Sequence, residues 1–163
     1  MYIQIFTAGG TIDKEYFDKE SEYSVGEPFI EEILLELNMN FEYEITTIMR
    51  KDSLDMTDED RQIILSEIIK SPHKRIILTH GTDTMQDTAK VLEGIKDKTI
   101  VLTGSLKPGK FHKTDAVFNI GFALGALQQL PFGVYICMNG MTFLGNAVKK
   151  NRNAGRFEGK TIE

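Results

Sequence analysis

The sequence predicts a single α/β domain built on a doubly wound, mostly parallel sheet. Short runs rich in β-branched and aromatic residues alternate with runs that carry apolar residues at helical spacing, as in repeated strand-helix units. Two of the short runs, Ile76–Leu78 and Ile100–Leu102, are continuously apolar, which is typical of strands buried on both faces. The length of 163 residues suits one domain with a real core. We therefore expect three layers in a flavodoxin-like arrangement, with helices on both sides of the sheet.

Five runs are predicted as strands: Tyr2–Phe6, Tyr43–Ile48, Arg75–Thr79, Thr99–Thr103 and Val134–Met138. The first helix covers Pro28–Leu37. Thr57 caps the second helix, because its hydroxyl can accept a hydrogen bond from a free amide of the first turn, and three acidic residues follow it. That helix ends at Ile69, before a Ser-Pro pair. Two further helices, Asp83–Leu92 and Ala116–Leu130, each follow a strand directly.

The segment 139–163 loses this periodicity and gains Gly, Asn and Lys, so we expect a hairpin or an extended arm there. It contains the nearest approach to a basic patch, which is interleaved with Asn and Gly and is interpreted as a solvated loop: Lys149, Lys150, Arg152 and Arg156. The formal net charge of -5 also disfavours a nucleic-acid partner, since such binding needs a concentrated basic surface.

The composition excludes several other classes of protein. The apolar fraction of 41% and the charged fraction of 26% are near the globular norm. The single cysteine, Cys137, lies in an apolar run and is expected to be a buried hydrophobe. The three histidines are widely spaced, which predicts no metal site. The start lacks the pattern of a signal peptide, and no apolar stretch has the length of a membrane span, so we expect a cytoplasmic protein without membrane contact.

Polar clusters follow the first four predicted strands directly. They are Thr7–Thr11, Asp52–Asp55, His80–Asp83 and Gly104–Ser105. In doubly wound sheets the ligand crevice lies beyond the carboxyl ends of the strands. The sequence therefore predicts a site at this edge.

The first cluster contains a candidate nucleophile. Gly9 and Gly10 permit a close backbone approach to a ligand, and they leave amide groups free to meet an oxyanion. The hydroxyl of Thr11 can then attack a carbonyl if a neighbouring group takes its proton. For a Gly-Gly-Thr tripeptide taken alone, a plain tight turn is the better explanation, because matches to so short a motif are common.

The third cluster gathers hydroxyls and a carboxylate at the start of a helix. Asp83 could hold a substrate ammonium, and Thr82 could orient water or assist a proton transfer. Both could also serve only as helix caps. His80 is interpreted as a packed, hydrogen-bonded side chain rather than as the base.

On these motifs the chain resembles the bacterial-type L-asparaginases over essentially its whole length. Ala8-Gly-Gly-Thr-Ile12 is similar to the Thr-Gly-Gly-Thr-Ile signature of that family, and His80-Gly-Thr-Asp-Thr-Met85 matches its second signature without a mismatch. Weaker similarities are seen at Tyr23–Gly26 to a flexible loop with a tyrosine, at Asp52–Met56 to a loop that binds the substrate carboxylate, at Gly104–Pro108 to a Gly-Ala-Met-Arg-Pro-like run, and at Lys150 to a catalytic lysine.

The resemblance implies hydrolysis of L-asparagine to L-aspartate and ammonia through a threonine acyl-enzyme, without a cofactor and with glutamine as a poorer substrate. It implies Thr11 as nucleophile and Tyr23 near it. Thr82, Asp83 and Lys150 would form a second catalytic group in which the lysine supplies a base or tunes the hydroxyl. The substrate contacts would come from Gly10, Ser53, Thr82, Asp83 and the backbone of Ser105.

Three departures accompany the resemblance. Ala8 stands where the signature has threonine, and Asp13 stands where a small residue is usual. Full-size members also have a second, smaller domain that contributes an acidic residue across a subunit contact. We expect residues 1–163 to form the N-terminal catalytic domain without that second domain, and to assemble as a dimer or tetramer.

Two other functions fit the same residues. One is a non-catalytic module that binds asparagine or aspartate and has lost turnover. The other is the amide-releasing subunit of a tRNA-linked amidotransferase, which neither the acidic charge nor the length favours.

Overall fold

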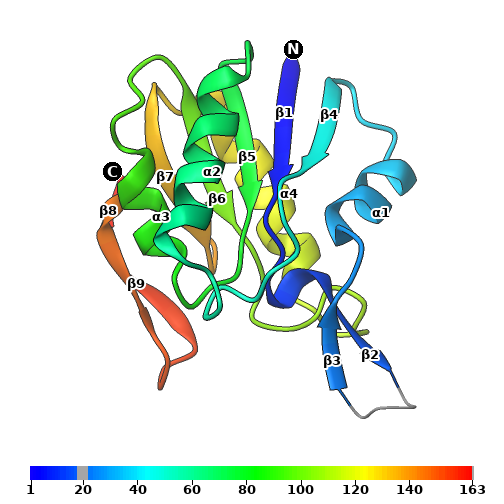
Figure 1. Cartoon of the computed structure of the whole chain (residues 1–163). Coiled ribbons are helices and arrows are strands. Elements are labelled where there is room, and N and C mark those ends of the chain that lie inside the picture. The colour runs from blue at the N-terminus through cyan, green and yellow to red at the C-terminus, as the bar shows by residue number, and fades with distance from the viewer. Residues whose placement is uncertain (18–21, 163) are drawn as a thin grey trace.

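The computed structural model describes residues 1–17 and 22–162 and contains a seven-stranded sheet with helices on both faces (Figure 1). The strand order is β4-β1-β5-β6-β7-β8-β9. Five neighbouring strands pair in parallel: β1 (Tyr2–Thr7), β4 (Glu42–Thr47), β5 (Arg75–Thr79), β6 (Thr99–Thr103) and β7 (Gly133–Met138). Counted along the chain, these five have the order 2-1-3-4-5, which is the flavodoxin-like order. The predicted fold class is confirmed.

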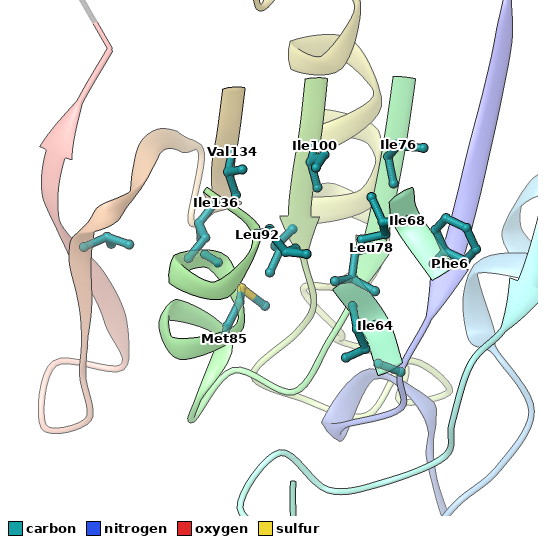
Figure 2. Packing of buried hydrophobic residues seen from close by; sticks show 14 of the residues in the cluster. Phe6, Ile64, Ile68, Ile76, Leu78, Met85, Leu92, Ile100, Val134 and Ile136 are labelled. Carbon is teal, nitrogen blue, oxygen red and sulfur yellow. The ribbon is translucent and has the colours of Figure 1, made fainter. Parts of the chain in front are cut away.

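In the described ranges, four helices cover the sheet: α1 (Phe29–Glu36), α2 (Asp58–Lys70), α3 (Met85–Leu92) and α4 (Ala116–Gln129). One apolar cluster joins α2 and α3 to one face; it includes Ile64, Leu78 and Met85 (Figure 2). A second cluster joins α1 and α4 to the other face. The three-layer arrangement follows, and Cys137 is fully buried in the second cluster, as expected.

The helix boundaries agree with the predictions except at α3. Thr57 accepts a hydrogen bond from the Asp60 amide and forms a capping box, as its sequence context indicates. Helix α3 begins at Met85 instead of the predicted Asp83. The reason is that the amide of Asp83 and the hydroxyl of Thr84 are hydrogen-bonded to Ser53, which keeps this turn outside the helix.

Hairpins extend the molecule at both ends of the chain, although only the C-terminal one was expected. The predicted C-terminal arm forms β8 (Met141–Asn151) and β9 (Arg156–Thr161), which extend the sheet in antiparallel fashion. The other hairpin, β2 (Lys14–Phe17) with β3 (Glu22–Val25), was missed. Four residues per strand give too short a pattern for alternation to be read.

No helix in the described part of the chain is both long enough and apolar enough to cross a lipid bilayer.

Candidate active site

The loops that follow β1, β4 and β5 meet through their backbones at the carboxyl edge of the sheet. A Cβ atom on Gly10 would lie 2.3 Å from the Cα of Gly81, and a Cβ on Gly81 would lie 2.6 Å from the Cβ of Ser53. Gly10 also has a φ of 99°, which L-residues with side chains rarely adopt. Each glycine directly precedes a candidate threonine, Thr11 or Thr82. The close approach therefore brings the two signature turns together, as the sequence predicts.

Thr11 opens a short 3₁₀ turn, η1 (Thr11–Asp13), and its side chain is half-buried. No described side chain caps this turn. The turn lies where β1 leaves the sheet, which is the crevice position of a doubly wound fold. A hydroxyl at this position can approach a ligand at the carboxyl edge.

Lys150, Thr82 and Asp83 form a compact polar group. The ammonium of Lys150, near the end of β8, donates to the Thr82 hydroxyl at 2.7 Å and to the Asp83 carboxylate at 3.1 Å. Thr82 is almost fully buried, with 2% of its surface exposed. The structure thus brings together the three residues that the resemblance groups as catalytic, although 68 positions separate Lys150 from Thr82.

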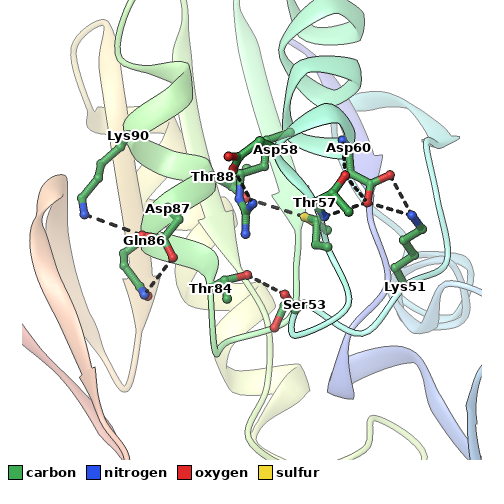
Figure 3. A network of polar contacts seen from close by, with 12 residues as sticks. Lys51, Ser53, Thr57, Asp58, Asp60, Thr84, Gln86, Asp87, Thr88 and Lys90 are labelled. Atoms are coloured by element: carbon green, nitrogen blue, oxygen red, sulfur yellow. Dashed lines mark hydrogen bonds and ion pairs between the residues drawn. The ribbon is translucent and has the colours of Figure 1, made fainter.

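Ser53 supports the turn that carries Thr82 and Asp83. Its hydroxyl accepts a hydrogen bond from the Asp83 amide at 3.2 Å. Its carbonyl accepts one from the Thr84 hydroxyl at 2.8 Å, which Figure 3 shows. Ser53 is 1% exposed. It therefore lies beside the predicted substrate residue Asp83 and also holds it in place, a role that was not predicted from the sequence.

Arg152 lies beside the candidate site, although it was predicted to lie in a solvated loop. Its Nε atom lies 3.2 Å from the same Asp83 oxygen that Lys150 contacts, although most of the Arg152 side chain is exposed. Arg152 follows Lys150 by two positions and lies in the turn just past the end of β8. Its nearness in sequence to the candidate Lys150 was the signal that could have revealed it.

His80 is fully buried and serves as a structural side chain. Its Nδ1 atom lies 2.7 Å from the Gly81 carbonyl, which can only accept, so Nδ1 carries the hydrogen. Nε2 then accepts from the Thr88 hydroxyl at 2.8 Å. Burial lowers the pKa of His80 to about 4, so the ring is neutral at pH 7. The structure agrees with the interpretation of His80 as a packed residue.

The remaining predicted residues differ in how much the structure says of them. Ser105 is buried, and its hydroxyl donates to the Lys107 carbonyl, so this hydroxyl has no hydrogen left to donate to a ligand. Tyr23 is placed in β3, opposite Tyr16, but its side chain lies outside the described side chains.

Known proteins resemble this chain in sequence. Residues 2–158 match the family model described as "Asparaginase, N-terminal". The glutaminase-asparaginase of Acinetobacter glutaminasificans is 34% identical over 95 residues, which cover 55% of this chain and 29% of that protein. A glutamyl-tRNA(Gln) amidotransferase subunit of Haloquadratum walsbyi is 27% identical over 127 residues, covering 72% of this chain and 29% of that protein.

Solved structures of L-asparaginases are also similar to this chain. The thermostable L-asparaginase of Thermococcus kodakarensis superposes with a TM-score of 0.86 at 25% identity, covering 98% of this chain and 51% of that one. L-asparaginase I of Vibrio cholerae superposes with a TM-score of 0.84 at 26% identity, covering 99% and 52%. The chain thus spans about half of these solved structures and under a third of the two sequence relatives. The match over residues 2–158 shows that the chain belongs to the asparaginase family, through the N-terminal domain of that family.

Proposed function

We propose that this chain hydrolyses the side-chain amide of L-asparagine, with L-glutamine as a second substrate. The observation that carries the proposal is the 2.7 Å contact between the Lys150 ammonium and the Thr82 hydroxyl, next to the turn of Thr11. A cation, a buried hydroxyl and a carboxylate at one crevice provide the groups that an amide hydrolase needs.

The proposed reaction has two steps on Thr11. The threonine oxygen attacks the amide carbonyl, its proton passes to a neighbouring base, and backbone amides of the glycine turn stabilise the oxyanion. The C–N bond then breaks, ammonia leaves with the transferred proton, and an ester to Thr11 remains. Water hydrolyses the ester and restores the hydroxyl. Lys150 acts through Thr82, either as the base or by tuning this hydroxyl.

Asp83 and the residues around it would orient the substrate. Its carboxylate would bind the α-ammonium, most readily through the oxygen that faces neither Lys150 nor Arg152, because those two cations contact Oδ1. The Ser53 hydroxyl accepts from the Asp83 amide, so its hydrogen remains for the α-carboxylate. Gly10 would admit the ligand, the backbone of Ser105 would receive the leaving amide, and Tyr23 would approach from the β2–β3 hairpin.

Our proposal includes action in the cytoplasm as a homo-oligomer. The substrate ammonium would be bound by Asp83 alone or with acidic residues supplied from elsewhere in the oligomer. Light scattering on the purified chain measures the assembly directly.

Ammonia release from asparagine and glutamine tests the proposal. We expect Thr11→Ala to lower turnover by about a thousandfold or more, the scale for loss of a nucleophile. Thr161→Ala, on β9 away from the crevice, is the matched control and should keep wild-type turnover. Wild-type activity in Thr11→Ala would remove the nucleophile assignment. Thermal stabilisation of the wild type by aspartate without any ammonia release would instead favour a binding module.

The similarity to an amidotransferase subunit over 72% of the chain favours a second candidate, an ammonia-releasing subunit that serves a partner enzyme. This alternative predicts that glutamine exceeds asparagine in kcat/KM and that turnover rises when the partner is present. A higher kcat/KM for asparagine in the isolated chain would exclude it.

A further inference from the structure

The buried acidic residue Asp13 joins the two ends of the β2–β3 hairpin. The backbone carbonyl of Asp13 accepts a hydrogen bond from the Gly26 amide at 2.7 Å, just after β3. Its carboxylate accepts one from the Phe29 amide at 2.9 Å, at the start of α1. Asp13 therefore joins both ends of the hairpin to each other and to the helix that follows.

The same residue completes the turn that carries Thr11. The Asp13 amide donates to the Gly10 carbonyl at 3.1 Å, and the neighbouring Ile12 carbonyl accepts from the Gly109 amide at 3.0 Å. The turn is thus held from three directions by the loop before it, the hairpin beyond it and the loop after β6. A change at Asp13 acts directly on the backbone two residues from Thr11.

Ion pairs continue these connections from the hairpin to the candidate site. Lys14 lies 2.5 Å from Asp52, next to Ser53, and Glu15 lies 2.5 Å from Lys110 in the loop that also carries Ser105. These pairs are partly exposed and contribute little by themselves. Asp13 is 4% exposed, so its hydrogen bonds are made away from water.

We infer that Asp13 is a positioning residue, which closes the base of the β2–β3 hairpin and thereby fixes the turn that carries Thr11. The expected effect of Asp13 on turnover rests on the proposed hydrolysis. The expected effect of Asp13 on the hairpin base does not.

The environment of Asp13 adds a dependence on pH. Burial raises the pKa of this carboxyl to about 7, against smaller opposing effects of the Phe29 amide and of Arg50. Ionisation of a buried carboxyl favours open conformations in which water reaches it, so the hairpin base should loosen as the pH rises from about 4 to about 7. The other charged groups around the base are already paired: Arg50 with Glu27, Lys14 with Asp52, and Lys110 with Glu15 and Glu32.

Amide hydrogen exchange at Gly26 and Phe29 tests the structural part. We expect Asp13→Ala to increase exchange at the Phe29 amide by about five- to tenfold, the scale for one hydrogen bond, because the variant lacks the carboxylate that accepts from this amide. The Gly26 amide bonds to the backbone carbonyl, which the variant keeps, so its exchange should rise less and report the opening of the hairpin base. Asp13→Asn keeps an oxygen acceptor in the same place and should retain most of the protection. It should also lose the fall in protection between about pH 4 and 7 that the wild type shows. Asp97→Asn, on an exposed loop at the opposite edge of the sheet, is the matched control.

Ammonia release by the same variants tests the kinetic part. Asp13→Ala should lose about tenfold in kcat with a smaller change in KM, and Asp13→Asn should restore kcat. Wild-type exchange in Asp13→Ala overturns the role at the hairpin base, and faster exchange with an unchanged kcat overturns the link to Thr11. If Asp13→Ala does not fold, wild-type pH dependence of exchange in Asp13→Asn overturns the inference. A wild type that releases no ammonia contradicts the proposed function, while exchange still decides the role of Asp13.

Discussion

Lys150 reaches the candidate site as a single side chain from the end of β8, where it contacts both Thr82 and Asp83. Its side chain is 14% exposed, whereas the adjacent Lys149 is exposed to solvent. Two neighbouring lysines of the same strand therefore occupy opposite environments, as the alternation of a strand requires. Substitutions at these two lysines therefore distinguish the loss of one positive charge from the loss of the ammonium that contacts Thr82.

Replacing the single residue Lys150 with methionine should abolish most of the turnover. The variant keeps the length and apolar character of the side chain but leaves the buried Thr82 hydroxyl without its donor. We expect kcat to fall by about a hundredfold or more, the range for loss of a group used in proton transfer. Lys149→Met is the control and should retain kcat. An active Lys150→Met enzyme would require another base.

At the scale of elements, the parallel core could be predicted because its strands are continuous apolar runs and its helices carry caps. The bounds of β5 and β6 agree with the prediction to the residue. The start of α3 was wrong because Ser53, 30 positions from Asp83, decides it. Local patterns hold no information on such distant partners.

The family signatures made Thr11, Thr82 and Lys150 candidates from the sequence alone. Their approach to one another depends on strand order, which periodicity does not supply. Asp13 was noted only as a departure from the family, since neither its burial nor its bond to Phe29 is visible in the sequence.

The loop after β1 offers a test of how closely these elements must approach. Gly10→Ala would place a methyl group 2.3 Å from the Gly81 Cα and would strain a φ of 99°. We expect a loss of about 2–4 kcal/mol in the free energy of unfolding, from strain and overpacking together. Urea titration measures this value.

Gly125→Ala is the matched substitution with the opposite sign. Gly125 lies within α4, and a Cβ there meets open space. The Gly125→Ala variant should gain about 0.5–1 kcal/mol in the free energy of unfolding, the helix preference of alanine over glycine. Equal effects of the two substitutions would refute the proposed close approach.

At the scale of the whole molecule, two buried groups make global stability depend on pH in opposite directions. The pKa of Asp13 is raised to about 7, so the native state binds more protons than the unfolded chain below that pH, and stability falls as the pH rises from about 4 to 7. The pKa of His80 is lowered to about 4, so its contribution is complete above pH 6.5 and is lost as the pH falls toward 4. The two contributions largely offset each other in the wild type.

Asp13→Asn should reveal the contribution of His80 alone. Its free energy of unfolding should rise by about 3 kcal/mol between pH 4 and 6.5, from a pKa difference of about 2.5 units at 1.36 kcal/mol each. The wild type should change much less over the same interval. Urea unfolding at four pH values checks the difference, and parallel curves for the two proteins would contradict it.

The contact between Gly10 and Gly81 limits how this site can be altered. The two backbones touch at glycines, so neither position has a side chain whose size can be varied. Substitution at these positions can therefore do little to change the distance between the two threonine turns. In the described residues, the β2–β3 hairpin and the β8–β9 arm reach the crevice through side chains that form ion pairs there. Laboratory evolution toward other amides should therefore accumulate its successful changes on these two hairpins and leave the glycines untouched.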